Sequence, residues 1–183
     1  QPGESTRQSF AGINNGPVKI ASDHGVPIVA AERVIYKVNG VQTSFTEMMG
    51  LPDGQLNPTY WLPWYNNVDL DTQLRFGNVS DNPATVHVLI GGIEITGNPF
   101  TLQPGESTRQ SFAGINNGPV KIQSDHGVPI VAAERVVYKV NGNNTSFTEM
   151  MALPNSQLNT TYWLPWYNNV DLDTQLRFGN VSN

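Results

Sequence analysis

The sequence predicts an all-β fold, an antiparallel sandwich or barrel, and three observations support this prediction. Runs rich in β-branched and aromatic residues alternate with turn signals at intervals of roughly 8–12 residues. No helical segment of roughly 10–15 residues separates these runs, which disfavours a parallel α/β sheet. Charged residues make up only 14% of the chain, which contains 17 glycines and 13 prolines. This composition favours strands and turns over helices.

The chain repeats itself internally. The stretch YWLPWYNNVDLDTQLRFGNVS at Tyr60–Ser80 recurs unchanged at Tyr162–Ser182, an offset of 102 residues. Gln1–Asp81 realigns on Gln103–Asn183 with few differences. A repeat of this length matches a small domain with its own core, whereas solenoid units run roughly 20–50 residues and cannot bury a core alone. We therefore expect domains in series, with about eight strands in each 102-residue repeat (Tyr60 to Tyr162).

The first half of the repeat is predicted to contain strands joined by turn dipeptides. Glu4–Phe10 and Val18–Ile20 are expected to be short strands, because a turn cluster separates them and Val18–Ile20 alternates apolar with polar residues. Pro27–Val38 is the longest β-rich run, and Asn39-Gly40 follows it as a strong hairpin signal.

Thr43–Met49 fits two structures. Ser44 and Glu47 match a capping box and Gly50 could stop a helical turn. The same residues also alternate as a strand, which we favour because a hairpin turn precedes them. Leu51–Thr59 is polar and rich in turn residues, and it differs at three positions between the copies.

The second half is predicted to contain four further segments. Residues with β propensity alternate with Asn, Asp, Gly and Pro, which mark the turns. The expected order is a strand at Tyr60–Tyr65, a loop at Asn66–Asp71, a strand at Thr72–Ser80, and a strand at Ala84–Ile90 whose hairpin turn is Gly91-Gly92.

Two domain phases are compatible with the repeat. In the first, residues 1–59 are the C-terminal part of a preceding repeat, 60–161 a complete repeat and 162–183 the start of a following one, so that the chain is a window of a longer polypeptide. In the second, 1–82 and 103–183 are compact units joined by the hairpin 83–102, and the aromatic stretch completes the sheet of the preceding unit as a donated strand. The alternating, β-branched composition of TVHVLIGGIEI favours the first phase.

The motifs of the whole period resemble a bacterial immunoglobulin-like repeat that occurs in tandem in secreted and cell-surface proteins. The resemblance rests on residues 60–67 (YWLPWYNN), Ile90-Gly91-Gly92, Leu102-Gln103-Pro104-Gly105, Phe112-Ala113-Gly114, Gly118-Pro119-Val120, Ser124-Asp125 and Ala133–Val136 with Tyr138. It implies immunoglobulin-like β-sandwich domains with a structural or adhesive role and no catalytic residues. Asn66 replaces the usual aspartate, and His24 and His126 stand in the Ser-Asp turn. These departures put any metal role of that aspartate in doubt.

Composition argues against several functions. The net charge is −5 and no cluster of Lys and Arg appears, so nucleic acid is not an expected partner. The chain has no cysteine, which excludes disulfides and thiol chemistry. No apolar run approaches the roughly 20 residues that span a bilayer, so we expect no membrane insertion in this segment. The resemblance implies an extracellular or cell-surface location.

The aromatic residues of the repeated stretch are the candidate interface residues. Large amphipathic side chains anchor interfaces, and exposed aromatic rings stack on sugars. Positions 61 and 64 have opposite parity along a strand, so we expect one tryptophan in the core and the other at a junction or surface. The candidates are Tyr60, Trp61, Trp64 and Tyr65 with their copies Tyr162, Trp163, Trp166 and Tyr167.

The polar residues favour structural roles. Asp69 and Asp71, with Asn66 and Asn67, offer oxygen ligands for Ca²⁺. Two carboxylates without a third fit better with an Asx-rich loop whose side chains cap their own backbone. Glu32 and Arg33, with their copies Glu134 and Arg135, are strand neighbours on opposite faces and do not pair with each other. At least one of them needs a buried partner, and a structural ion pair is expected. The histidines show no triad or metal spacing. We predict no catalytic, cofactor or metal site.

The sequence therefore predicts a non-enzymatic structural segment of an extracellular fibre or filament. Its expected partners are neighbouring copies of the repeat, in the same chain or in adjacent protomers, possibly with shared strands. The alternative is a carbohydrate-binding or adhesin module that binds surface glycans through the Trp/Tyr stretch.

Overall fold

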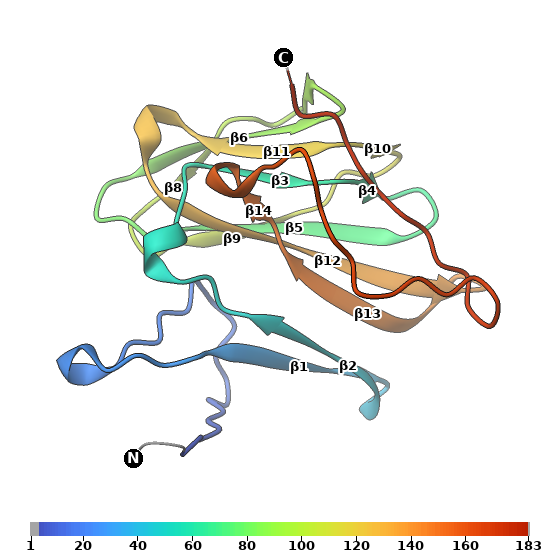
Figure 1. The fold of residues 1–183 in the computed structure, drawn as a ribbon, viewed down its shortest axis with the longest axis horizontal. Coiled ribbons are helices and arrows are strands. Elements are labelled where there is room, and N and C mark those ends of the chain that lie inside the picture. Colours follow the sequence, from blue (N-terminus) through green and yellow to red (C-terminus); the bar gives the residue numbers. More distant parts are fainter. Residues whose placement is uncertain (1–3, 183) are drawn as a thin grey trace.

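The computed structural model describes residues 4–182, and its regular structure is almost entirely antiparallel β-strand (Figure 1). Helical structure in the described residues is limited to 3-10 turns of three residues each. These are η1 (Asp23–Gly25), η2 (Asp53–Gln55), η3 (Asp125–Gly127) and η4 (Asn155–Gln157). The prediction of an all-β fold is confirmed. No described helix has the length and apolar character needed to cross a membrane.

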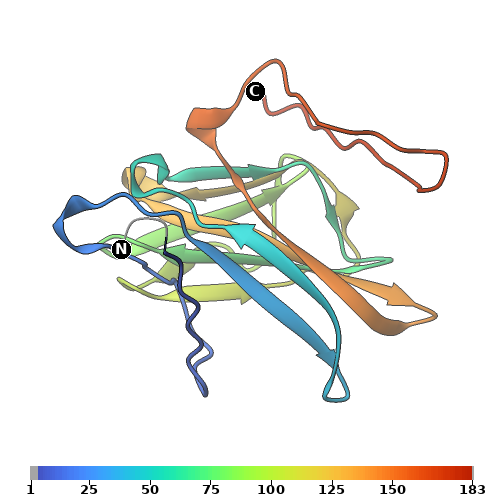
Figure 2. The same cartoon turned by 60° about the horizontal axis from the view of Figure 1, so that its bottom comes forward.

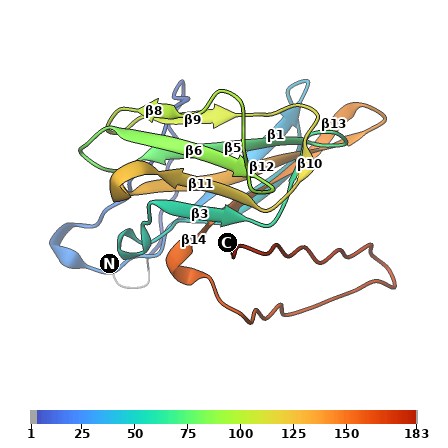
Figure 3. The same ribbon diagram turned by 90° about the horizontal axis from the view of Figure 1, so that it is seen from above.

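Two antiparallel sheets face each other in the body of the molecule. The first sheet contains β14 (Leu153–Pro154), β3 (Thr59–Leu62), β11 (Val120–Ser124), β6 (Ala84–Ile90), β7 (Ile93–Glu94) and β8 (Phe100–Leu102). The second contains β13 (Asn143–Met151), β12 (Ile130–Val140), β5 (Asp71–Asn78) and β9 (Ser107–Gln110), in that order. Figure 1 shows the first sheet above the second, and Figure 3 shows β3, β11 and β6 from above.

Two shorter pairs complete the fold. Strands β4 (Tyr65–Asn66) and β10 (Asn116–Asn117) pair beside the first sheet. Strands β1 (Ala31–Val38) and β2 (Val41–Met49) form a separate hairpin that lies below the second sheet in Figure 1.

The hydrophobic core lies between the two sheets. Its residues alternate along each strand, as the pleat of a half-buried strand requires. Val86 and Val88 point inward from β6, while Leu74 and Phe76 point inward from β5. All residues of this core cluster fall between Tyr60 and Ala152. The hairpin of residues 83–102 contributes strands to the first sheet and side chains to this core.

The hairpin turns form where the sequence predicts them. Asn39 (φ 51°) and Gly40 (φ 81°) connect β1 to β2, and Gly91 (φ 61°) and Gly92 (φ 79°) connect β6 to β7. Positive φ at both central residues is the geometry that Asn-Gly and Gly-Gly favour. The strand prediction for Thr43–Met49 is also confirmed, because these residues lie in β2.

The prediction of one strand at Tyr60–Tyr65 is wrong. The strand ends at Leu62, and Tyr65 begins β4, which pairs with β10 instead of β11. Pro63 lacks the N–H that a continued ladder needs. The break also lets Leu62 and Tyr65, which have opposite parity, both point into the core.

The expected strands near the two ends are also absent from the described residues. Glu4–Phe10 and Val18–Ile20 form no strand, although the same sequences form β9 and β11 in the second copy. Tyr162–Ser182 forms no strand, although the identical residues 60–80 form β3, β4 and β5. A strand needs a partner for its backbone groups, and β9 and β11 obtain theirs from β5 and β3.

Candidate functional site at the junctions between repeats

The two tyrosines of the first aromatic stretch belong to the core. Tyr60 is fully buried and its hydroxyl donates to the Ile130 carbonyl at 2.8 Å. Tyr65 is also buried; its hydroxyl donates to the Thr72 carbonyl at 3.1 Å and accepts from the Phe112 N–H at 2.6 Å. These bonds satisfy the polar ends of two large apolar side chains, as buried tyrosines require.

The expectation that one tryptophan lies in the core is wrong. Trp61 is half-buried and Trp64 is 36% exposed, because the tyrosines occupy the inward positions. The Trp61 indole donates to Asn155 Oδ1 at 2.9 Å, and Lys121 Nζ lies 5.4 Å from its ring centroid. The Trp64 indole donates to Asn116 Oδ1 at 2.8 Å. Both indoles are therefore fixed at the surface of the body.

The second copy of the stretch is exposed. Tyr162, Trp163, Trp166 and Tyr167 are all exposed, each more so than the residue that matches it in the first copy. Near its end, this copy approaches the body: residues Gln175, Leu176, Arg177 and Phe178 line a shallow cleft of about 410 Å³ together with Trp64, Asn66 and Asn116. Trp64 therefore lies at the boundary between one copy of the repeat and the next.

The β1-β2 hairpin packs on the second sheet, against β13. Figures 1 and 2 show it running alongside β12 and β13. The rings of Tyr36 and Phe147 lie 5.1 Å apart, and the Glu149 N–H donates to Thr46 Oγ at 3.3 Å. Phe147 and Glu149 lie opposite Val137 and Arg135 on β12. These odd-numbered residues of β12 point away from the core, into which Ile130 and Ala132 point. The hairpin thus covers the face of the second sheet that points away from the core.

This packing changes the environment of a repeated ion pair. Arg135 lies 2.6 Å from Glu149, with side chains 22% and 3% exposed. The same pair in the first copy, Arg33 and Glu47, is 2.7 Å apart but 53% and 52% exposed. The predicted structural ion pair is confirmed, and its partner comes from the neighbouring strand. A pair sheltered from solvent is screened less than an exposed one.

Two close approaches between glycine and proline recur with the period of the sequence. A β-carbon added at Gly77 would lie 3.3 Å from Pro17 Cβ, and one added at Gly179 would lie 2.9 Å from Pro119 Cβ. Both the glycines and the prolines are 102 residues apart in the sequence (77 to 179, 17 to 119). Gly179 therefore approaches Pro119 as Gly77 approaches Pro17.

Electrostatic contacts repeat with the same offset. Glu134 is 7% exposed and its Oε2 has no hydrogen-bond partner among the described residues. Burial raises the pKa of this carboxyl to about 7, and the positive charge of Arg177 opposes the rise. Burial likewise raises the pKa of Glu32, and Arg75 is among the charges that oppose it. In both cases the glutamate feels an arginine 43 residues later in the sequence (32 to 75, 134 to 177).

The raised pKa of Glu134 predicts a pH dependence of stability. Below pH 4.5 the carboxyl is protonated in both the folded and the unfolded chain. From there to about pH 7 the unfolded chain releases its proton first, so stability falls as the pH rises, by on the order of 3 kcal/mol. Glu134→Gln should remove this loss and raise the unfolding midpoint at pH 8, measured by urea titration at pH 5 and pH 8.

The matched comparison is Glu32→Gln, at the same position of the first copy, where the side chain is exposed. This change should alter the pH dependence of stability in the same direction but by less. His87 also makes stability fall as the pH rises, in every variant. Its pKa is raised chiefly by the hydrogen bond to Glu94, so its stabilising effect is also lost with rising pH. An unchanged pH profile in Glu134→Gln would contradict the assignment.

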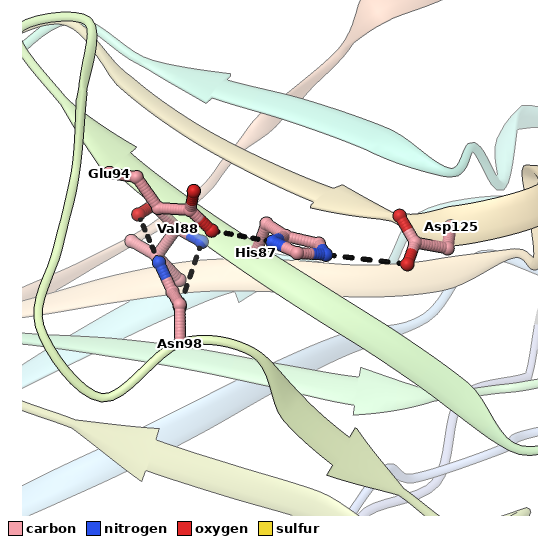
Figure 4. A network of polar contacts seen from close by, with 5 residues as sticks. All are labelled: His87, Val88, Glu94, Asn98 and Asp125. Atoms are coloured by element: carbon pink, nitrogen blue, oxygen red, sulfur yellow. Dashed lines mark hydrogen bonds and ion pairs between the residues drawn. The ribbon is translucent and has the colours of Figure 1, made fainter.

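A second polar cluster surrounds His87 on β6 (Figure 4). Its Nδ1 lies 2.6 Å from Glu94 Oε1 and its Nε2 lies 3.3 Å from Asp125 Oδ2. Asn98 holds the backbone of Val88 beside it through two hydrogen bonds. This cluster was not predicted from the sequence, although the Gly91-Gly92 turn sets the register that places Glu94 opposite Leu89, diagonal to His87. With both ring nitrogens engaged by carboxylates, the arrangement ties η3 and β7 to β6.

The Asn66–Asp71 loop caps its own backbone. Asn66 Oδ1 accepts from the N–H groups of Val68 and Asp69 at 3.0 and 3.1 Å. This confirms the interpretation of the loop as an Asx turn. Within residues 4–182, no group of three or more His, Asp or Glu side chains is placed to hold a metal ion.

Comparisons with known proteins give little. No protein-family model matches the sequence, and no curated protein matches it. A solved structure described as "Crystal Structure of Thermotoga maritima 1070" superposes with a TM-score of 0.41 at 13% sequence identity. The superposition covers 54% of this chain and 94% of that chain. A likeness of this extent carries no functional argument.

Proposed function

We propose that this chain is a structural, non-enzymatic segment of an extracellular or cell-surface array of immunoglobulin-like domains. Residues 60–161 form one complete domain, residues 1–59 belong to the domain before it and residues 162–183 to the domain after it. The array works mechanically, because each domain buries its own core and defined junctions set the spacing between domains.

The observation that carries the proposal is the recurrence of the junction contacts. The pairs Pro17–Gly77 and Pro119–Gly179 repeat at the sequence offset, and so do the charge pairs Glu32–Arg75 and Glu134–Arg177. A flexible string of domains needs no such contacts. A regular stack makes the same contact at each step.

The carbohydrate-binding alternative has less support. The Trp64 indole is bonded to Asn116, and the cleft beside it is lined partly by the following copy. A glycan stacked on Trp64 would compete with that copy for the same surface. The exposed rings of Trp163 and Trp166 lie in a segment whose first copy is part of a folded body.

The proposal predicts a constant rise for each repeat. Small-angle X-ray scattering should be compared between this chain and a chain lengthened by one further 102-residue copy (residues 60–161), at concentrations where both are monomeric. The longest dimension should increase with a well-defined distance distribution, as in a rigid rod. A broad distribution typical of freely jointed domains would overturn the proposal.

A pair of variants tests the junction itself. Phe147→Asp places a charge against Tyr36 in the buried contact and should broaden the distribution. Phe45→Asp makes the same change at the matching, exposed position and should leave the scattering of the monomer unchanged.

A further inference from the structure

His87 on β6 contacts a carboxylate through each of its two ring nitrogens (Figure 4). Its Nδ1 lies 2.6 Å from Glu94 Oε1, and its Nε2 lies 3.3 Å from Asp125 Oδ2. The three residues come from three different elements, β6, β7 and η3. The His87 side chain is 29% exposed, so the ring can exchange protons with the solvent.

Only a protonated imidazole satisfies both contacts of His87. The imidazolium carries an N–H at each nitrogen, whereas the neutral ring carries one N–H and one lone pair. An ionised carboxylate accepts hydrogen bonds and donates none, so it repels a lone pair that faces it. Loss of the proton from His87 therefore breaks one of its two contacts, whichever nitrogen keeps its hydrogen.

The contact with Asp125 is the one that breaks. Glu94 lies closer to the ring than Asp125 does, so the remaining N–H stays at Nδ1 and continues to donate to Glu94. The lone pair of Nε2 then faces the Asp125 carboxylate. In the part of the chain that the structure describes, the Asp125 side chain makes no hydrogen bond other than the one to His87. Deprotonation therefore frees this side chain from β6.

The η3 turn keeps its shape without this contact. The same tripeptide forms η1 in the first copy, where the φ of the central histidine is 59°, against 54° in η3. His87 is bonded to Asp125 and not to Asp23, yet the two turns match. The contact with His87 thus fixes the position of η3 against β6, and its loss releases an intact turn.

The η3 turn is the connection between the two sheets, because it follows β11 of the first sheet and precedes β12 of the second. The residues on either side of it hold the chain that leads into β3. The Ser124 N–H donates to the Pro58 carbonyl at 2.8 Å, and the Ile130 N–H donates to the Asn57 carbonyl at 3.2 Å. A contact that positions η3 therefore positions the crossover from one sheet to the other.

We propose that His87 is a pH-sensitive clamp, which holds the η3 turn against β6 when the ring is protonated and releases the turn when the ring is neutral. Glu94 from β7 and Asp125 from η3 are the charged groups that face the ring. Lys121 is the charged residue of β11, and its Nζ lies over the aromatic ring at position 61 of β3, on the side of β11 away from β6. The clamp lies within residues 60–161 and does not depend on the proposed array.

The clamp is closed on the acidic side and opens as the pH rises. The pKa of His87 is raised from 6.5, chiefly by the hydrogen bond to Glu94; burial opposes the rise and Asp125 adds to it. With a raised pKa in the folded chain, the stabilisation from the clamp is complete below pH 6.5 and is lost as the pH rises through the raised pKa. At the acid end the clamp holds until the carboxylates take up protons, near roughly pH 4.

Nuclear magnetic resonance of the full chain, from about pH 6 to about pH 9, tests the proposal. Carbon-bound protons are followed, because exposed amide protons exchange too fast with water at the alkaline end. The ring signals of His87 report its protonation, while the Hα signals of Gly127 and the methyl signals of Val128 report the turn. The turn signals should shift and narrow with the same pH midpoint as the His87 signals, since the released turn is more mobile.

Two variants separate the clamp from other titrations. Glu94→Gln removes the largest cause of the raised pKa of His87, so the His87 midpoint and the turn midpoint should move together to lower pH. In Asp125→Asn the side-chain amide can offer its oxygen to the imidazolium or its NH₂ to the lone pair of the neutral ring. The turn of this variant should stay in place while His87 titrates. The Glu94 and Asp125 side chains are 51% and 43% exposed, so both variants should fold.

Asp23→Asn is the matched control, because it makes the same change in η1 and should leave the transition of η3 unaltered. Turn signals that stay constant while His87 titrates would overturn the proposal, as would an unchanged transition in Asp125→Asn. A turn midpoint that stays in place in Glu94→Gln while the His87 midpoint moves would also overturn it. That result would assign the transition to another group, such as Glu134 with its pKa of about 7.

Discussion

Phe76→Ala should lower the free energy of unfolding by about 3–5 kcal/mol, whereas Phe178→Ala should change it by less than about 0.5 kcal/mol. The two phenylalanines occupy the same position of an identical stretch. Phe76 lies in the core, where its ring meets Phe100 edge-on with centroids 5.6 Å apart. Truncation there removes buried area and leaves a cavity, while truncation of the exposed Phe178 removes neither.

Urea unfolding followed by tryptophan fluorescence checks this prediction, at a concentration low enough to keep the chain monomeric. The slope of free energy against urea should stay the same in both variants, so that the midpoints report stability directly. Equal losses in the two variants would mean that the C-terminal stretch shares a core in the monomer. That result would contradict the exposed state of its aromatic residues.

Gly118→Ala should destabilise the chain by about 1–3 kcal/mol, because the added carbon has no room. The carbon would lie 2.9 Å from Trp64 Cα and would also meet the Pro63 carbonyl oxygen. Both obstacles are backbone atoms, so the connection between β3 and β4 must move. That connection carries Trp64, and its displacement should break the indole bond to Asn116.

The matching change Gly16→Ala should have little effect. Its added carbon would lie 3.1 Å from Ser107 Oγ, the end of a small side chain that can rotate away. Thermal unfolding compares the stabilities of the two variants, and the tryptophan emission maximum reports the Trp64 environment. Gly118→Ala should show both a lower midpoint and a red-shifted emission. A fall of equal size in Gly16→Ala would contradict the clash as the cause of the loss, since the entropy change of Gly→Ala in the unfolded chain is itself stabilising.

Local signals predicted much of the fold. Asn39-Gly40 and Gly91-Gly92 define their hairpins because few other residues adopt positive φ at two successive positions. The alternation of Val86, Val88 and Ile90 identified β6 and its buried face. These predictions succeeded because turn chemistry and pleat parity act over a few residues.

The candidate site was predicted less well. Parity assigned one tryptophan to the core, but the break at Pro63 changes which residues face inward, and the core takes Tyr60 and Tyr65 instead. The partner of Arg135 is Glu149, which lies on the next strand and depends on the hairpin register. The junction surfaces could not be foreseen, because they depend on how whole sheets stack.

The aromatic stretch shows what can be predicted from sequence and what depends on tertiary structure. The sequence by itself determined the repeat and its period, the strand character of the stretch, and the turns around it. The tertiary structure alone decided that Tyr60–Ser80 forms core strands while the identical Tyr162–Ser182 stays unpaired and exposed. The reason is physical: a strand is stable only when other strands satisfy its backbone groups and cover its apolar face. Identical residues therefore adopt different structures according to the partners within reach.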